Sequence, residues 1–116
     1  MYQYILTYQG QYSITNIYGL PTIGVCHGDD LIYVFDSLTP PLNDKDQFVS
    51  NLMTTAWTNF AKYGDPTPPD SGYEWVPRIE NSHNYFDISG PDSATKISEE
   101  IEERTALWDQ ILGKTK

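Results

Sequence analysis

Residues 24–31 form the stretch Gly-Val-Cys-His-Gly-Asp-Asp-Leu, which does most to decide how the rest of the chain is interpreted. It places His27 on a loop flanked by two glycines, directly before an apolar segment that begins with two acidic residues. An imidazole can take up and return a proton near neutral pH, so a histidine on such a loop is a candidate for acid–base chemistry.

No nucleophile motif accompanies this histidine. The 116 residues contain no Gly-x-Ser-x-Gly sequence, the strand-to-helix turn that exposes the nucleophilic serine of many hydrolases. A proton-transfer group without a nucleophile is only one part of a hydrolytic site. The sequence therefore predicts the histidine-bearing end of a larger enzyme.

Composition narrows the class of protein. A hydrophobic fraction of 39% and an aromatic fraction of 14% are enough for a core of one domain. The chain has 7 basic and 16 acidic residues, a net charge of -9, which disfavours nucleic acid and anionic membranes as partners. The longest apolar run, Leu31–Phe35, is far shorter than the roughly 20 residues that a membrane helix needs.

Signals for export and for cofactor binding are missing from the sequence. Residues 1–8 lack the basic region and the small-residue cleavage site of a secretory signal, so the compartment is left open. Cys26 is the single cysteine and cannot form an internal disulfide, and no Cys/His cluster has zinc spacing. We expect neither a metal nor a cofactor.

The first half of the chain gives one clear element and one ambiguous one. Residues 2–8 predict a strand with bulky side chains on both faces, and residues 13–18 have only a loose pattern. Asp29 or Asp30 could cap a helix that follows, whereas residues 32–35 are equally typical of a strand.

The second half predicts two helices separated by a loop and a strand. Asp44 and Gln47 form a capping-box pattern before a helix expected over about residues 46–63, which Gly64 ends. A loop over residues 64–72 and a short strand over residues 85–88 follow. The chain then turns at Gly90-Pro91 and ends in a helix over residues 98–112, which Ser98 could cap.

The order of these motifs resembles the C-terminal portion of the type-B carboxylesterase and cholinesterase family. In that family an aromatic strand leads to a Gly-Val-x-His-Gly-x-Glu/Asp loop, then to a helix ending in Trp-x-Asn-Phe-Ala-x-x-Gly-Asp-Pro. Residues 24–30 match the first motif, and residues 57–66 are Trp-Thr-Asn-Phe-Ala-Lys-Tyr-Gly-Asp-Pro. The later matches follow in order at residues 75–77, 85–88 and 107–108, so the resemblance covers essentially the whole chain.

The resemblance implies a fold and a function. Residues 1–116 would be the C-terminal part of a carboxylesterase type-B domain: an α/β protein holding the last sheet strands, the histidine loop and the packing helices of an α/β-hydrolase fold, incomplete on its own. His27 would be the catalytic histidine of a Ser-His-Glu triad acting on a small-molecule ester. The family's nucleophile, acid and oxyanion loop lie in the N-terminal part of the domain, so we expect this chain alone to be inactive. Family members are often secreted.

Two other functions remain open. The chain could belong to a non-catalytic interaction module, as the adhesion relatives of this family are, or could be an incomplete gene product with no independent role. A Gly-x-Ser-x-Gly motif upstream would indicate the enzyme, and a full-length domain without that motif would indicate adhesion.

Several residues have a simpler interpretation than catalysis or binding. A Cys26–His27 dyad is disfavoured because adjacent residues in an extended loop point apart, so Cys26 is expected to pack. A metal site of His27, Asp29 and Asp30 is disfavoured because three ligands on one short loop do not readily surround an ion. His83 is expected in an exposed turn. The larger aromatic residues are expected in the core: Trp57, Phe60, Trp75 and Trp108.

Overall fold

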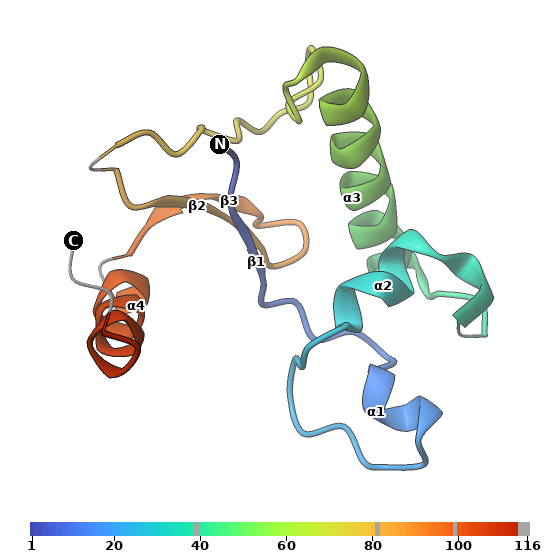
Figure 1. The fold of residues 1–116 in the computed structure, drawn as a ribbon. Helices are drawn as coiled ribbons and strands as arrows, with labels where there is room; N and C mark the ends of the chain where they lie inside the picture. Colours follow the sequence, from blue (N-terminus) through green and yellow to red (C-terminus); the bar gives the residue numbers. More distant parts are fainter. Residues whose placement is uncertain (39, 81, 99, 114–116) are drawn as a thin grey trace.

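The computed structural model describes residues 1–38, 40–80, 82–98 and 100–113. A three-stranded sheet lies between the two longest helices (Figure 1). Its strand order is β1-β2-β3, with β1 parallel to β2 and β2 antiparallel to β3. The strands are β1 (Tyr4–Leu6), β2 (Asn84–Ile88) and β3 (Ala94–Ile97); the helices are α1 (Ile14–Ile17), α2 (Asp29–Val34), the 3-10 helix η1 (Asp36–Leu38), α3 (Asp44–Tyr63) and α4 (Glu100–Ile111).

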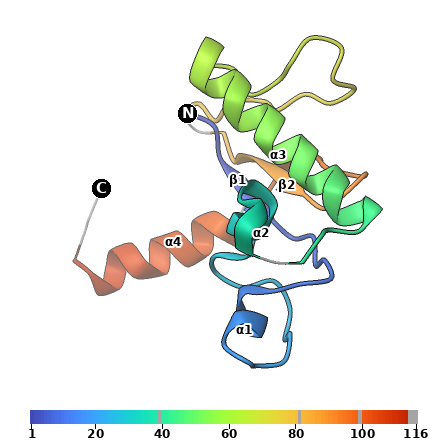
Figure 2. The ribbon, with the colours of Figure 1, turned by 90° about the vertical axis from the view of Figure 1, so that its right-hand side faces the viewer.

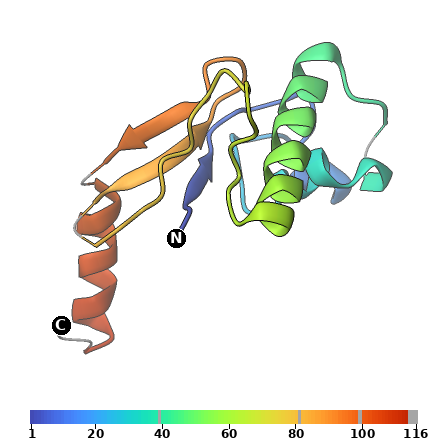
Figure 3. The same cartoon turned by 90° about the horizontal axis from the view of Figure 1, so that it is seen from above.

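The hydrophobic core lies between α3 and the sheet. Its centre is Trp75, which comes from the irregular segment before β2 and stacks on Phe86 with ring centroids 4.8 Å apart. Figure 3 shows α3 on one side of the strands, as this packing requires. Removing such rings from water supplies the main stabilisation of the chain. The buried members of the core are Tyr33, Val49, Met53, Ala56, Trp75, Phe86 and Ile88.

Helix α3 confirms the strongest sequence signal, with one correction. It begins two residues before the expected start, because Asn43 is the N-cap and accepts hydrogen bonds from the backbone of Lys45 and Asp46. The proposed cap, Asp44, is instead the first helical residue. Gly64 ends the helix as predicted, in the left-handed conformation with φ +73° that glycine tolerates.

The sequence prediction missed helix α1, strand β3 and the 3-10 helix η1. Helix α1 is opened by Ser13, whose backbone N–H donates to the side chain of Asn16, so asparagine takes the place of the Glu or Gln expected in a capping box. Strand β3 forms by pairing with β2 across the turn at Gly90-Pro91, although its own sequence carries little strand pattern. Strand β1 is shorter than the predicted 2–8, whereas β2 confirms the strand expected over 85–88.

Two of the aromatic residues expected in the core lie at the surface. Trp108 is 61% exposed and Phe60 is 51% exposed, whereas Trp75 is buried as predicted and Trp57 is half-buried. Trp108 is on α4, which extends away from α3 (Figure 2). Apolar residues at helical spacing predict an apolar face, but the spacing does not show whether another element covers that face. No helix in the described part of the chain is long and apolar enough to cross a membrane.

Candidate active site

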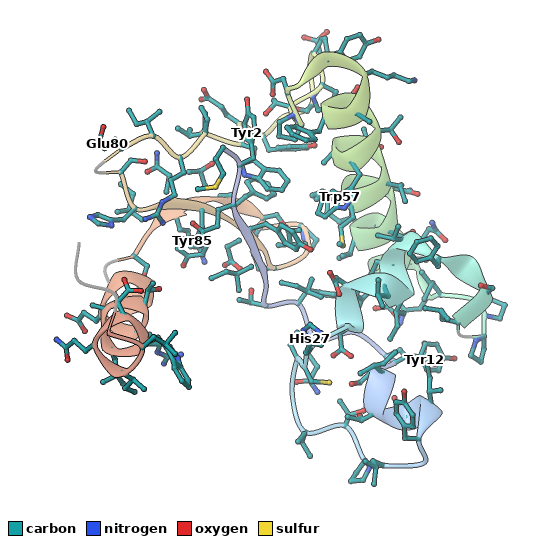
Figure 4. The ribbon with its side chains drawn as sticks, viewed as in Figure 1. Tyr2, Tyr12, His27, Trp57, Glu80 and Tyr85 are labelled. Carbon is teal, nitrogen blue, oxygen red and sulfur yellow. The ribbon has the colours of Figure 1, made fainter. Side chains whose placement is uncertain are left out.

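His27 lies at the apex of a tight turn. The turn runs from Cys26 to Asp29 and is closed by the backbone N–H of Asp29, which donates to the carbonyl of Cys26 at 3.1 Å. Gly28 occupies the third position with φ +93° and ψ -4°, the angles of a type II turn. Figure 4 places His27 on the loop beyond the end of β1 and next to α2. The imidazole is exposed to solvent.

Helix α2 resolves the ambiguity of residues 29–35 in favour of a helix, but neither aspartate caps it. Gly28 is the N-cap and has no side chain to offer, so the expectation of a cap at Asp29 or Asp30 was wrong. Both aspartates fall in the first turn, where their negative charge favours the positive end of the helix dipole. Each carboxylate then binds a different part of the chain.

The carboxylate of Asp29 is buried, with 4% exposure, and is surrounded by donors. Its Oδ1 accepts from the hydroxyl of Ser13 at 2.9 Å, from the backbone N–H of Ile14 at 2.7 Å and from the thiol of Cys26 at 3.4 Å. Its Oδ2 accepts from the backbone N–H of Cys26 at 3.0 Å. Burial by itself would raise the pKa of Asp29, but these hydrogen bonds hold it below its usual value.

Asp30 ties the start of α2 to the sheet. The hydroxyl of Tyr4 on β1 donates to Oδ2 of Asp30 at 2.8 Å. Burial, together with this hydrogen bond and the negative charge of Asp30, raises the pKa of Tyr4 to about 12. The same two residues border an open cavity of about 310 Å³. Its lining residues are Tyr4, Leu6, Val25, Cys26, His27, Gly28 and Asp30.

The residues considered as alternatives to a catalytic histidine are hydrogen-bonded to residues other than His27. The thiol of Cys26 lies 3.2 Å from the hydroxyl of Ser13 and makes polar contacts where plain packing was expected. Asp29 and Asp30 bind different segments, and no group of three or more His, Cys, Asp or Glu in the described ranges is arranged to hold a metal.

His83 lies far from His27 in the sequence and on a different element. It directly precedes β2 and is half-buried, so the expected exposed turn was wrong. Its carbonyl accepts a hydrogen bond from the backbone N–H of Ser98 at 3.3 Å, which extends the pairing of β2 with β3.

Sequence reasoning missed the partners of the two aspartates. Ser13 and Tyr4 lie 16 and 26 residues from the aspartates they bind, so no local pattern joins them. The one available signal was the Ser13-x-x-Asn16 spacing, which marks a helix start but does not name Asp29 as the acceptor.

This mixed sheet with its histidine turn and covering helix is part of an α/β-hydrolase fold of the carboxylesterase type. The sequence model of the carboxylesterase family matches residues 1–108, and the chain belongs to that family. The crystal structure of juvenile hormone esterase from Manduca sexta, with OTFP covalently attached, is similar with a TM-score of 0.73 and 29% identity over 95% of this chain.

Curated relatives agree with this assignment. Bile salt-activated lipase of Rattus norvegicus is 38% identical in an alignment that covers 71% of this chain. Juvenile hormone esterase of Tribolium castaneum is 31% identical in an alignment that covers 93% of this chain. The matched regions span only 14% of the rat lipase and 22% of the beetle esterase. The chain is thus related to ester hydrolases several times its length.

Proposed function

We propose that this chain is the C-terminal part of a carboxylesterase type-B domain and that His27 is the catalytic histidine of a Ser-His-Glu ester hydrolase. The observation that carries the proposal is the setting of His27. Its imidazole is exposed beside a cavity of about 310 Å³, while both ends of its turn are fixed by hydrogen bonds. A general base needs both properties, because it must reach substrate and hold its orientation.

The proposed chemistry is acyl transfer through a serine. The imidazole of His27 accepts the serine proton as the oxygen attacks the ester carbonyl, and then returns that proton to the leaving alcohol. A water molecule, activated by the same imidazole, releases the acid from the acyl-enzyme. The substrate class is a small-molecule ester, and no cofactor takes part.

The serine, the triad acid and the oxyanion donors have to come from a partner. The 116 residues contain no nucleophile motif, and the proposed partner is the N-terminal part of the same domain. Without the serine there is no atom to be acylated, so His27 alone is not a site.

A chimera tests the proposal. In the Manduca sexta esterase, the segment that superposes on this chain is replaced by residues 1–113, and hydrolysis of a short-chain aryl ester is measured. We expect activity, a fall in kcat of about 10³-fold or more for His27→Ala, and little change for the matched control His83→Ala. A folded chimera that is inactive, or that keeps its kcat after His27→Ala, would overturn the proposal.

A further inference from the structure

We propose that Asp29 is a positioning residue for His27: its carboxylate holds the histidine turn closed and fixes it to α1 without touching the imidazole. This inference rests on the proposed function of His27. The buried carboxylate has no role in the acyl-transfer steps above, which require only the serine, the histidine, a triad acid and oxyanion donors. Its contacts instead determine where the turn lies.

Two hydrogen bonds join Asp29 to the backbone of Cys26. Its backbone N–H donates to the carbonyl of Cys26 at 3.1 Å, and its Oδ2 accepts from the backbone N–H of Cys26 at 3.0 Å. Both bonds join Cys26 to Asp29, and His27 and Gly28 are the two residues between them. The backbone of His27 therefore lies in a turn that two hydrogen bonds close. A type II turn closed by its single backbone bond would open more readily.

The other carboxylate oxygen anchors this turn to the fold. Oδ1 accepts from the hydroxyl of Ser13 and from the backbone N–H of Ile14, at the point where α1 begins. Residues 14 and 26, the two ends of the segment 14–26, therefore both lie at Asp29. One carboxylate joins both ends of this segment, and hydrogen bonds to a charged acceptor are stronger than those to a neutral one.

Packing does not hold the same segment. Most of its larger apolar side chains are exposed, with Ile23 at 83%, and the other two, Ile14 and Val25, are only half-buried. Helix α1 contains no buried residue. Because little apolar surface is removed from water here, the hydrogen bonds of Asp29 are the main contacts that tie the segment leading to His27 to the rest of the fold. The exposed apolar residues of the segment are Ile17, Tyr18, Leu20 and Ile23.

Asp29→Asn is the informative substitution because it keeps the shape of the side chain. An amide has one acceptor oxygen and one NH₂ group, which is a donor. In the variant the NH₂ group would therefore face either the N–H of Cys26 or the donors of Ser13 and Ile14, and the hydrogen bonds on that side would be lost. The matched control is Asp87→Asn. Asp87 is buried to the same degree, with 3% exposure, and pairs with Thr7 and Lys96 on the sheet.

The first measurement follows backbone hydrogen exchange in the 116-residue chain. We expect Asp29→Asn to speed exchange of the Ile14 and Cys26 amides by about tenfold or more relative to the amides of α3. Asp87→Asn should leave this ratio unchanged. If the ratio is also unchanged in Asp29→Asn, the carboxylate does not hold the turn and the inference is wrong.

The second measurement uses the chimera and separates positioning from plain stability. We expect Asp29→Asn to lower kcat by about 10²-fold with little change in KM, because a displaced general base weakens the transition state more than substrate binding. Asp87→Asn should keep kcat. If the Asp29→Asn chimera does not fold, Ser13→Ala removes a single donor, and we expect it to give a smaller loss of kcat and faster exchange at Ile14.

The outcomes distinguish this inference from the proposed function. Activity that survives His27→Ala overturns the role of His27. Activity that is lost in His27→Ala but unchanged in folded Asp29→Asn and Ser13→Ala overturns only the positioning role of Asp29.

Discussion

Replacing Gly28 by alanine should destabilise the chain through backbone strain alone. Gly28 has φ +93°, in the region that side chains with a Cβ rarely adopt. A Cβ built there would lie 3.8 Å from Cγ1 of Ile14 and 4.0 Å from Cδ1 of Leu31, which are ordinary contacts. No steric overlap adds to the strain, so the expected loss is about 1–2 kcal/mol of unfolding free energy. That is a factor of about 5–30 in the ratio of folded to unfolded chain.

Equilibrium unfolding in denaturant measures this loss, with the midpoint shifted and the slope unchanged. The matched control is Gly64→Ala, at the end of α3. Gly64 has φ +73° and no atom within 4 Å of an added Cβ, so its replacement carries similar strain far from His27. Both variants should lose similar stability, but only Gly28→Ala should also speed exchange of the Cys26 amide.

Two results would refute this reasoning. If Gly64→Ala is destabilised and Gly28→Ala is not, the turn around His27 does not have the described backbone angles. If Gly28→Ala loses stability with no local change at Cys26, the turn does not hold that residue.

Three further predictions follow from other parts of the chain. Gly10→Ala should destabilise more than Gly28→Ala in the same denaturant assay, because its Cβ would overlap the Tyr33 hydroxyl and the buried Asp46 carboxylate. Burial, the hydrogen bond to Asp30 and the negative charge of Asp30 raise the pKa of Tyr4 from 10.0 to about 12. The contribution of the protonated Tyr4 hydroxyl to folding stability is therefore complete below pH 10 and is lost as the pH rises toward 12. Tyr4→Phe should flatten the alkaline fall in stability, which circular dichroism follows. The isolated chain should hydrolyse short-chain aryl esters no faster than free imidazole, and saturable turnover abolished by His27→Ala would contradict this.

Local signals predicted some elements well. Helix α3 was predicted because its apolar spacing lies within the helix and Gly64 follows it directly, and β2 because its residues favour a strand. Strand β3 and helix α1 depend on partners elsewhere in the chain, and Trp108 shows that spacing alone does not decide burial. The motif predicted His27 as the candidate, but the hydrogen bonds that anchor its turn to α1 join Asp29 to Ser13 and Ile14, which lie far from it in the sequence.

The most direct test of the account compares kcat for two histidine variants of the chimera, His27→Gln and His83→Gln. Both substitutions remove an imidazole and keep a polar side chain, so the ratio of the two kcat values isolates the position of the histidine. The account predicts that kcat for His27→Gln is lower by about 10³-fold or more, because triad members act as a unit. Equal kcat values for the two variants, in chimeras that fold alike, would contradict it.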